Sequence, residues 1–145
     1  MDLEKVEPMV VEGRIKIPYR WPSGQVGDLF LTALKEEGKI LGLRCPKCES
    51  VTVPPRPRCF TCLGTSEEWV EVGPEGEITT WTASEEGALL GLVQLDGADT
   101  ALLHRILVDS PAEVKPGMRV VAVFEETRKG SIIDLKGFQP IEVTS

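Results

Sequence analysis

The residues of this chain best suited to chemistry are its four cysteines, which form two Cys-x2-Cys pairs separated by ten residues: Cys45 and Cys48, then Cys59 and Cys62. A tight turn at each pair presents two thiolates to one ion, and a hairpin between the pairs brings the second opposite the first. Soft thiolates in a closed tetrahedral shell favour zinc. The spacing therefore predicts a four-cysteine metal site. Two disulfides are the alternative, and they would need an oxidising compartment.

A catalytic centre is not indicated by the remaining residues. His104 is the only histidine, so no Cys–His or Ser–His pair has a spare base. Its position inside a strand pattern favours a structural role. A closed four-thiolate shell also leaves no open coordination position for a reactive water, so the metal is expected to be structural. The sequence therefore predicts no catalytic residues and no activity of the chain alone.

The bulk properties suggest a small cytoplasmic protein. The 145 residues correspond to one domain or two small modules that share an interface. No apolar run approaches the ~18 residues of a membrane span, and the acidic start of the sequence lacks the apolar core of a signal peptide. A reducing cytosol would keep the four thiols free for a metal.

Charge is unevenly distributed along the chain. The net charge is −7, with +5 in residues 14–58 and −9 in residues 59–145. The overall acidity argues against nucleic acid as a partner. The basic part suits an anionic ligand or an acidic partner surface, or it is simply an unevenly charged solvated surface.

A helix is expected before the cysteines, and an extended segment before the helix. Residues 1–22 show little periodicity and end in an aromatic, proline-rich stretch, so they are expected to form an extended arm. Ser23 is expected to cap a helix that ends at Gly38. The apolar residues of that helix fall on one face, which must be buried: Val26, Leu29, Phe30, Ala33 and Leu34.

The segments beyond the helix read as short strands separated by turns. Strands are expected at 39–43, 68–72, 77–83, 88–95, 100–108, 118–124 and 131–138, with room for one helical turn at 111–117. Five or six short strands in the second half fit a small barrel of the OB type. The predicted fold is thus mainly β, with an arm at 1–22, a helix plus zinc ribbon at 23–66 and a five-stranded OB-fold domain at 67–145.

Several stretches together resemble one known family. The chain resembles the DUF35 family, whose members combine a helix, a rubredoxin-like zinc ribbon and an OB-fold, over about residues 24–140. The matching stretches are residues 27–38, 41–48, 54–62, 69–72, 76–82, 92–97 and 116–120. The chain departs from the family pattern at Glu49, because the family usually has glycine after the first cysteine pair. A turn that carries two metal ligands favours a residue tolerant of positive φ at that position.

The resemblance implies a function for the chain. Family members are typically non-catalytic partners of thiolases or thiolase-like enzymes, which bring the catalytic residues, and they help to hold the CoA part of the acyl-CoA substrate. One branch of the family accompanies thiolases that act on aromatic succinyl-CoA intermediates. The resemblance also implies that the four cysteines bind structural zinc and that the helix and ribbon form a partner surface. The basic bias would suit the phosphates of CoA, and the nearest candidates are Arg44, Lys47, Arg56 and Arg58.

Two other functions use the same features. A zinc ribbon and an OB-fold are both common in nucleic-acid-binding modules, although few aromatic residues are present for stacking on bases. A rubredoxin-like electron carrier would hold iron at the four cysteines instead of zinc.

Overall fold

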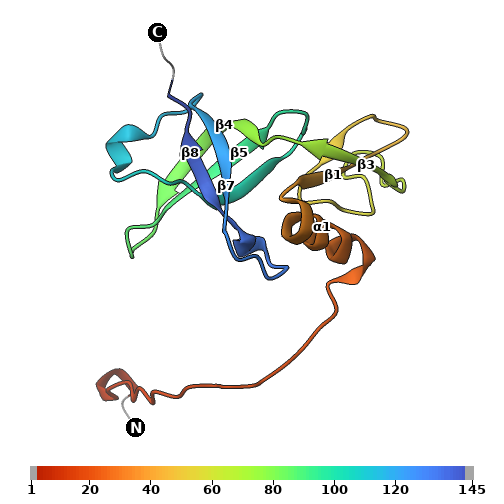
Figure 1. Cartoon of the computed structure of the whole chain (residues 1–145). Coiled ribbons are helices and arrows are strands. Elements are labelled where there is room, and N and C mark those ends of the chain that lie inside the picture. The colour runs from red at the N-terminus through yellow and green to blue at the C-terminus, as the bar shows by residue number, and fades with distance from the viewer. Residues whose placement is uncertain (1–2, 143–145) are drawn as a thin grey trace.

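The computed structural model describes residues 3–142 and places one helix, eight strands and three short 3-10 turns in them. An extended arm leads into the helix, which lies beside a small three-stranded sheet, and a five-stranded barrel follows (Figure 1). This order confirms the predicted fold class. The elements are η1 (Leu3–Lys5), α1 (Gly24–Glu37), β1 (Ile40–Arg44), β2 (Val51–Thr52), β3 (Glu68–Val72), β4 (Glu75–Ala83), β5 (Leu89–Leu95), β6 (Ala101–Arg105), η2 (Pro111–Glu113), β7 (Arg119–Phe124), η3 (Ile132–Asp134) and β8 (Leu135–Pro140).

Helix α1 begins and ends near the positions that the sequence predicts. Ser23 occupies the N-cap position, but its hydroxyl donates to the Asp28 carboxylate instead of accepting from the helix backbone. Gly38 ends the helix in the left-handed conformation, with φ of 61°, which glycine adopts without a Cβ clash. The Arg128 side chain reaches the same end and donates to the Lys35 carbonyl at 2.7 Å. The loop between β7 and β8 therefore holds the helix C-terminus in place.

The small sheet has the order β2-β1-β3, and all its pairings are antiparallel. The OB-fold domain expected from the sequence, residues 67–145, includes residues 69–72. In the structure they belong to β3 and pair with β1 from Ile40↔Val72 to Arg44↔Glu68. Gly73, with φ of 66°, and Pro74 then turn the chain before β4 begins. Strand β3 thus extends the ribbon, and the barrel sheet begins after this turn.

The barrel sheet has the order β6-β5-β4-β7-β8, again with antiparallel neighbours. A parallel bridge between Ile106 and Phe138 connects its two edges. The pairing of β4 with β5 shifts between Ile78 and Thr80, which marks a bulge. Beyond the bulge the alternation of β4 changes phase, so Trp81 packs against the core although it lies three residues after the buried Ile78.

One hydrophobic core joins the helix, the ribbon and the barrel. Phe30 and Leu34 of α1, Val51 and Val53 of the ribbon, and Phe138 of the barrel all belong to it. Each of these five side chains is at most 5% exposed. The ribbon is therefore packed onto the barrel and is not a separate finger on a linker. No helix within residues 3–142 has the length and apolar character that crossing a membrane requires.

Candidate metal centre

Two turns of matching geometry carry the four cysteines. In the first turn the Cys45 N–H donates to the Ser50 carbonyl at 3.0 Å, and the Cys45 carbonyl accepts from the Glu49 N–H at 2.9 Å. The second turn repeats this pattern: Cys59 donates to Gly64 at 2.8 Å and accepts from Leu63 at 3.0 Å. Each turn thus holds two thiols on one side of a closed backbone loop.

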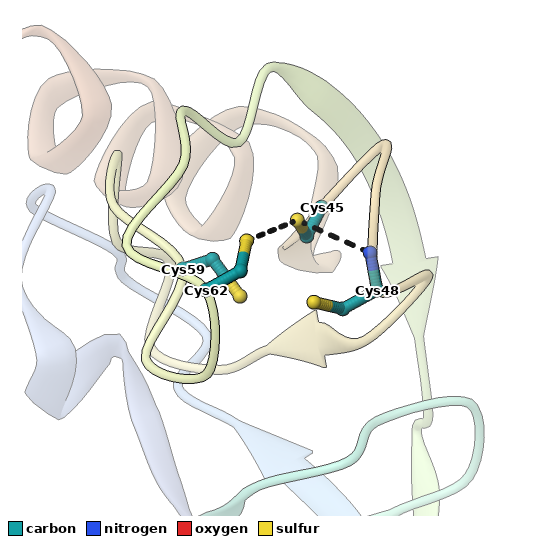
Figure 2. A group of neighbouring side chains, drawn as sticks. All are labelled: Cys45, Cys48, Cys59 and Cys62. Atoms are coloured by element: carbon teal, nitrogen blue, oxygen red, sulfur yellow. Dashed lines mark hydrogen bonds between the residues drawn. The ribbon is translucent and has the colours of Figure 1, made fainter.

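The two turns face one another, so the four sulfurs surround a common centre (Figure 2). All four Sγ atoms lie within 4.8 Å of one another, and those of Cys45 and Cys62 are 3.6 Å apart. Bonds of ~2.3 Å from zinc to four thiolates imply an edge of roughly 3.8 Å between sulfurs. Cys45 and Cys59 are buried, whereas Cys48 and Cys62 are exposed. The donor set and its size therefore fit a four-coordinate zinc ion, as the cysteine spacing predicts.

Backbone donors and crowding shift the pKa values of two thiols in opposite directions. The N–H groups of Cys62 and Thr61 hold the pKa of Cys59 at about 6, and the Thr61 N–H lies 3.4 Å from its sulfur. The facing Cys62 thiol, together with burial, raises the pKa of Cys48 to about 12. Four thiolates this close together repel one another unless a cation lies between them. The site therefore favours a bound divalent ion.

Both turns contain a non-glycine residue with positive φ. Glu49 and Leu63 each follow the second cysteine of a pair, with φ of 59° and 61°. Residues with a Cβ adopt this region at a cost, and glycine adopts it readily. The departure from the family pattern at Glu49 therefore leaves the turn intact and adds local strain.

The four basic residues expected to meet CoA differ in how the structure uses them. Arg44 pairs with Glu68 at 3.2 Å, and Arg58 donates to the Leu63 carbonyl at 3.2 Å, which ties it to the second turn. Within residues 3–142, Lys47 and Arg56 are exposed and have no ion pair or hydrogen bond. Two of the four are thus available to a ligand, and two are already engaged.

The side chain of His104 makes its contacts with other parts of the fold. Its Nδ1 accepts from the Arg105 backbone N–H at 2.9 Å, so the neutral ring carries its proton on Nε2, which donates to the Ile132 carbonyl at 3.3 Å. Burial lowers its pKa and outweighs the hydrogen bond to Ile132. The ring also packs edge-on against Phe138, with centroids 6.1 Å apart. Both ring nitrogens are therefore engaged within the fold.

Two family models match consecutive parts of the chain. The ChsH2 rubredoxin-like zinc ribbon domain matches residues 32–68, and the ChsH2 C-terminal OB-fold domain matches residues 69–125. Together they span more than half of the chain and contain all four cysteines. The chain belongs to the DUF35 family. The four cysteines of this DUF35 chain are positioned as a zinc ribbon requires.

Solved structures support this assignment of the fold. A DUF35 protein of unknown function from Sulfolobus solfataricus is 26% identical, with a TM-score of 0.58, over 69% of this chain and 77% of that one. The chain described as Ltp2-ChsH2(DUF35) aldolase is 21% identical, with a TM-score of 0.61, over 83% of this chain and 98% of that one. At this identity the second likeness concerns the fold alone.

One curated protein matches a segment of the DUF35 chain. It is the UDP-N-acetylmuramoylalanine–D-glutamate ligase of Mycolicibacterium vanbaalenii, which is 28% identical over 98 residues. The match covers 67% of this chain and 20% of the ligase, so the chain spans about a fifth of that protein's length.

Sequence reasoning did not identify the residues that support the metal ligands. The Ser50 hydroxyl lies 3.7 Å from the Cys59 sulfur, and the Thr61 and Cys48 N–H groups point at sulfurs of their own turns. The available signal is positional, because residues two or three places after the first cysteine of such a pair direct their N–H groups inward. Ser50 lies opposite the other pair, and no local pattern would have indicated it.

Proposed function

We propose that this chain is a non-catalytic, zinc-binding accessory subunit of a thiolase complex that helps to hold the CoA part of a β-ketoacyl-CoA. The convergence of all four thiols on one centre carries this proposal, because it leaves no cysteine free as a nucleophile. The single histidine uses both ring nitrogens inside the fold. The chemistry would therefore have to come from a partner.

Zinc would act here as a cross-link between the two turns. Cys45, Cys48, Cys59 and Cys62 would hold it, and a shell of four thiolates leaves no position for substrate or water. The ion would fix the ribbon against the barrel core, to which Val51 and Val53 already belong. Its contribution would be to the shape of a docking surface.

Membership of the DUF35 family supports a partner enzyme of the acyl-CoA class. Family members accompany thiolases or thiolase-like enzymes, and the solved structure of similar fold is described as an aldolase that contains a DUF35 chain. The exposed surfaces of the ribbon and helix are the parts expected to face the partner. An aromatic succinyl-CoA type of substrate is the narrower possibility that the resemblance suggests.

Lys47 and Arg56 are the best placed of the basic residues to contact the phosphates of CoA. Both are exposed, and neither is occupied by an internal partner within the described residues. Pro55 and Pro57, on either side of Arg56, line a surface hollow of ≈ 410 Å³ together with Ser23–Gly27. Arg44 and Arg58 would first have to leave Glu68 and the Leu63 carbonyl.

Reconstitution with a purified thiolase from the same organism tests the proposal. Each protein would be assayed alone and together for CoA-dependent cleavage of β-ketoacyl-CoA substrates, including an aromatic succinyl-CoA type. We expect no activity from the chain alone and a large gain in the complex. Exchanging both Lys47 and Arg56 for alanine should raise the KM for CoA, whereas exchanging Lys129, an exposed lysine of the β7–β8 loop, should leave it unchanged. A thiolase that is fully active without this chain would overturn the proposal.

A further inference from the structure

The arm before the helix has a strict two-residue pattern. From residue 9 to residue 21, every odd position except Gly13 is apolar, whereas the even positions include all the charged residues of this stretch. Side chains of a β-strand alternate between its two faces, so this period describes a strand with one apolar face. The residues of that face are 67–88% exposed: Met9, Val11, Ile15, Ile17, Tyr19 and Trp21.

The prolines of the arm follow the same period. Pro8, Pro18 and Pro22 all occupy even positions. The backbone groups of alternate residues point to opposite edges of a strand, so the edge formed by the odd residues keeps every N–H from 9 to 21. A strand that pairs along one edge only tolerates proline on the other edge. The arm therefore has the composition of an edge strand that lacks its neighbour.

The structure shows the arm extended and uncovered. The rings of Tyr19 and Trp21 stack at 4.6 Å between centroids, which places side chains two residues apart on one side of the backbone. Residues 4–25 are exposed throughout, and the arm runs away from the folded body (Figure 1). An apolar stripe of this length on a water-soluble surface marks an interaction site.

The sheets of this chain do not offer the arm a suitable edge in a second copy. Among the described residues, the edge strands β2, β3, β6 and β8 contain between two and six residues. The Ile106–Phe138 bridge also closes part of the barrel edge. The alternating segment 9–21 is more than twice as long as any of these strands. A different protein, whose sheet has a longer unpaired edge strand, is a better match for residues 9–21.

The charges of the arm describe the surface that it would meet. Residues 14–22 contain Arg14, Lys16 and Arg20 and no acidic residue. These three side chains share the even face, opposite the apolar one. Oppositely charged neighbours across two paired strands stabilise a sheet, and like charges destabilise it. The complementary edge strand therefore has apolar side chains on one face and acidic side chains on the other.

We propose that residues 9–21 add as an edge strand to an exposed sheet edge of the partner enzyme, an inference that rests on the proposed function. The odd residues supply both the backbone hydrogen bonds and the apolar contact, as in β-strand addition. Tyr19 and Trp21 alone would bury roughly 300–500 Å², a large part of the ~800 Å² that each partner contributes to a standard interface. The arm would thus be a principal determinant of assembly.

Adjacent valines provide a matched test of the apolar face. Val10 and Val11 are both 83% exposed, but they lie on opposite faces of the arm. The dissociation constant of the zinc-loaded full chain for the purified thiolase that it activates in the reconstitution assay would be measured by calorimetry. Val11→Ser should weaken binding about tenfold, and Val10→Ser should leave it unchanged. Equal effects of the two variants would overturn the proposal.

Gly13 provides a matched test of the hydrogen-bonding edge. It lies on the pairing edge, and an added Cβ meets no atom within 4 Å. Gly13→Pro removes the N–H and should weaken binding at least tenfold, whereas Gly13→Ala keeps it and should bind like the wild type. Equal binding by both variants would exclude strand pairing through this edge. Unchanged zinc content and thermal stability would confirm that the variants fold.

The outcomes separate this inference from the function on which it rests. If a chain without residues 3–21 binds and activates the thiolase normally, the strand addition is wrong and the accessory role stands. If the wild-type chain does not bind the thiolase at all, the accessory role and the strand addition both fail. Arm-dependent self-association in sedimentation, without arm-dependent binding to the thiolase, would assign the arm to a second copy and overturn the proposal.

Discussion

Val51 of the ribbon and Asp99 of the barrel are joined by two hydrogen bonds. The Val51 N–H donates to the Asp99 carboxylate at 2.7 Å, and the Asp99 N–H donates to the Val51 carbonyl at 2.9 Å. The next pair repeats the arrangement, because the Thr100 hydroxyl accepts from the Val53 N–H at 2.8 Å and donates to its carbonyl at 2.9 Å. The loop between β5 and β6 therefore fixes the ribbon on the barrel.

Removing these side chains should loosen the ribbon. Thr100→Val keeps the shape of the residue but leaves the N–H and carbonyl of the buried Val53 without their partner. An orphaned buried backbone group costs about 1–3 kcal/mol. We expect a loss of this size in the free energy of unfolding, measured with urea on the zinc-loaded chain. Asp109→Ala changes an exposed residue outside this contact and is the control. Equal stability of Thr100→Val and the control would show that the contact contributes nothing.

Each of the four cysteines should be required for zinc. Cys59→Ser replaces the thiol that receives most of the backbone support, so zinc content should fall from one ion per chain to near zero. Because the ribbon shares its core with the barrel, thermal stability should fall as well. Elemental analysis after gel filtration measures the first effect, and circular dichroism the second. Ser50→Ala, which leaves all four thiols in place, should retain the ion. Full iron occupancy in the wild type would contradict a zinc site.

Glycine in place of Glu49 should stabilise the first turn. The native φ of 59° is costly for a residue with a Cβ, and glycine avoids that cost at the expense of entropy in the unfolded chain. Glu49→Gly should raise the free energy of unfolding of the zinc-loaded chain by up to about 1 kcal/mol. Glu49→Ala retains the Cβ and should show no gain. A loss of stability in Glu49→Gly would mean that the Glu49 side chain makes a contribution that the geometry does not reveal.

Asp134 should make stability depend on pH in the acid range. Burial alone would raise its pKa, but the N–H groups of Lys129, Gly130 and Ser131 and the charge of Arg128 lower it below the usual value. A depressed folded pKa gives stability that is complete above the unfolded value of about 3.9 and is lost as pH falls toward the folded value. Asp134→Asn should therefore melt at a lower temperature than the wild type at pH 7.

The difference in melting temperature between wild type and Asp134→Asn should begin to shrink below about pH 4, where Asp134 of the unfolded chain takes up a proton, and should continue to shrink as pH falls toward the lower pKa of the folded carboxylate. Both proteins should lose zinc alike in acid because the four thiols are the same in each, so the comparison isolates the Asp134 side chain. Glu126→Gln, an exposed change in the same loop, should match the wild type at every pH. A difference that stays constant down to low pH would assign the effect of Asp134 to packing and not to its charge.

The features that the sequence predicted correctly depend on local patterns. The spacing of Cys45 and Cys48 by itself predicts a turn. The apolar residues of the helix that ends at Gly38 recur with a period of 3.6 residues, which predicts the helix and its buried face. Alternation likewise indicated the barrel strands. Contacts between segments that are distant in the sequence could not be predicted. The bulge next to Thr79 shifts the phase of β4, and Asp99, which binds Val51, lies 48 residues away.

The basic residues near the candidate site also make contacts that could not be predicted from the sequence. Sequence reasoning treated Arg44, Lys47, Arg56 and Arg58 as one set, because charge and proximity in the chain were the only criteria available. Arg44 and Arg58 are engaged by Glu68 and by the Leu63 carbonyl. Those contacts follow from the pairing of β3 with β1 and from the backbone of the second turn. Neither contact can be predicted from the types of residue or from their local spacing.

Native mass spectrometry of the chain co-expressed with a thiolase from the same organism tests the accessory role most directly. We expect a hetero-oligomer whose mass includes one zinc ion for each copy of this chain and none for the thiolase. Dissociation should release the small subunit with its zinc still bound. Separate masses for the thiolase and for this chain, at concentrations where the thiolase is fully active, would rule out the accessory role.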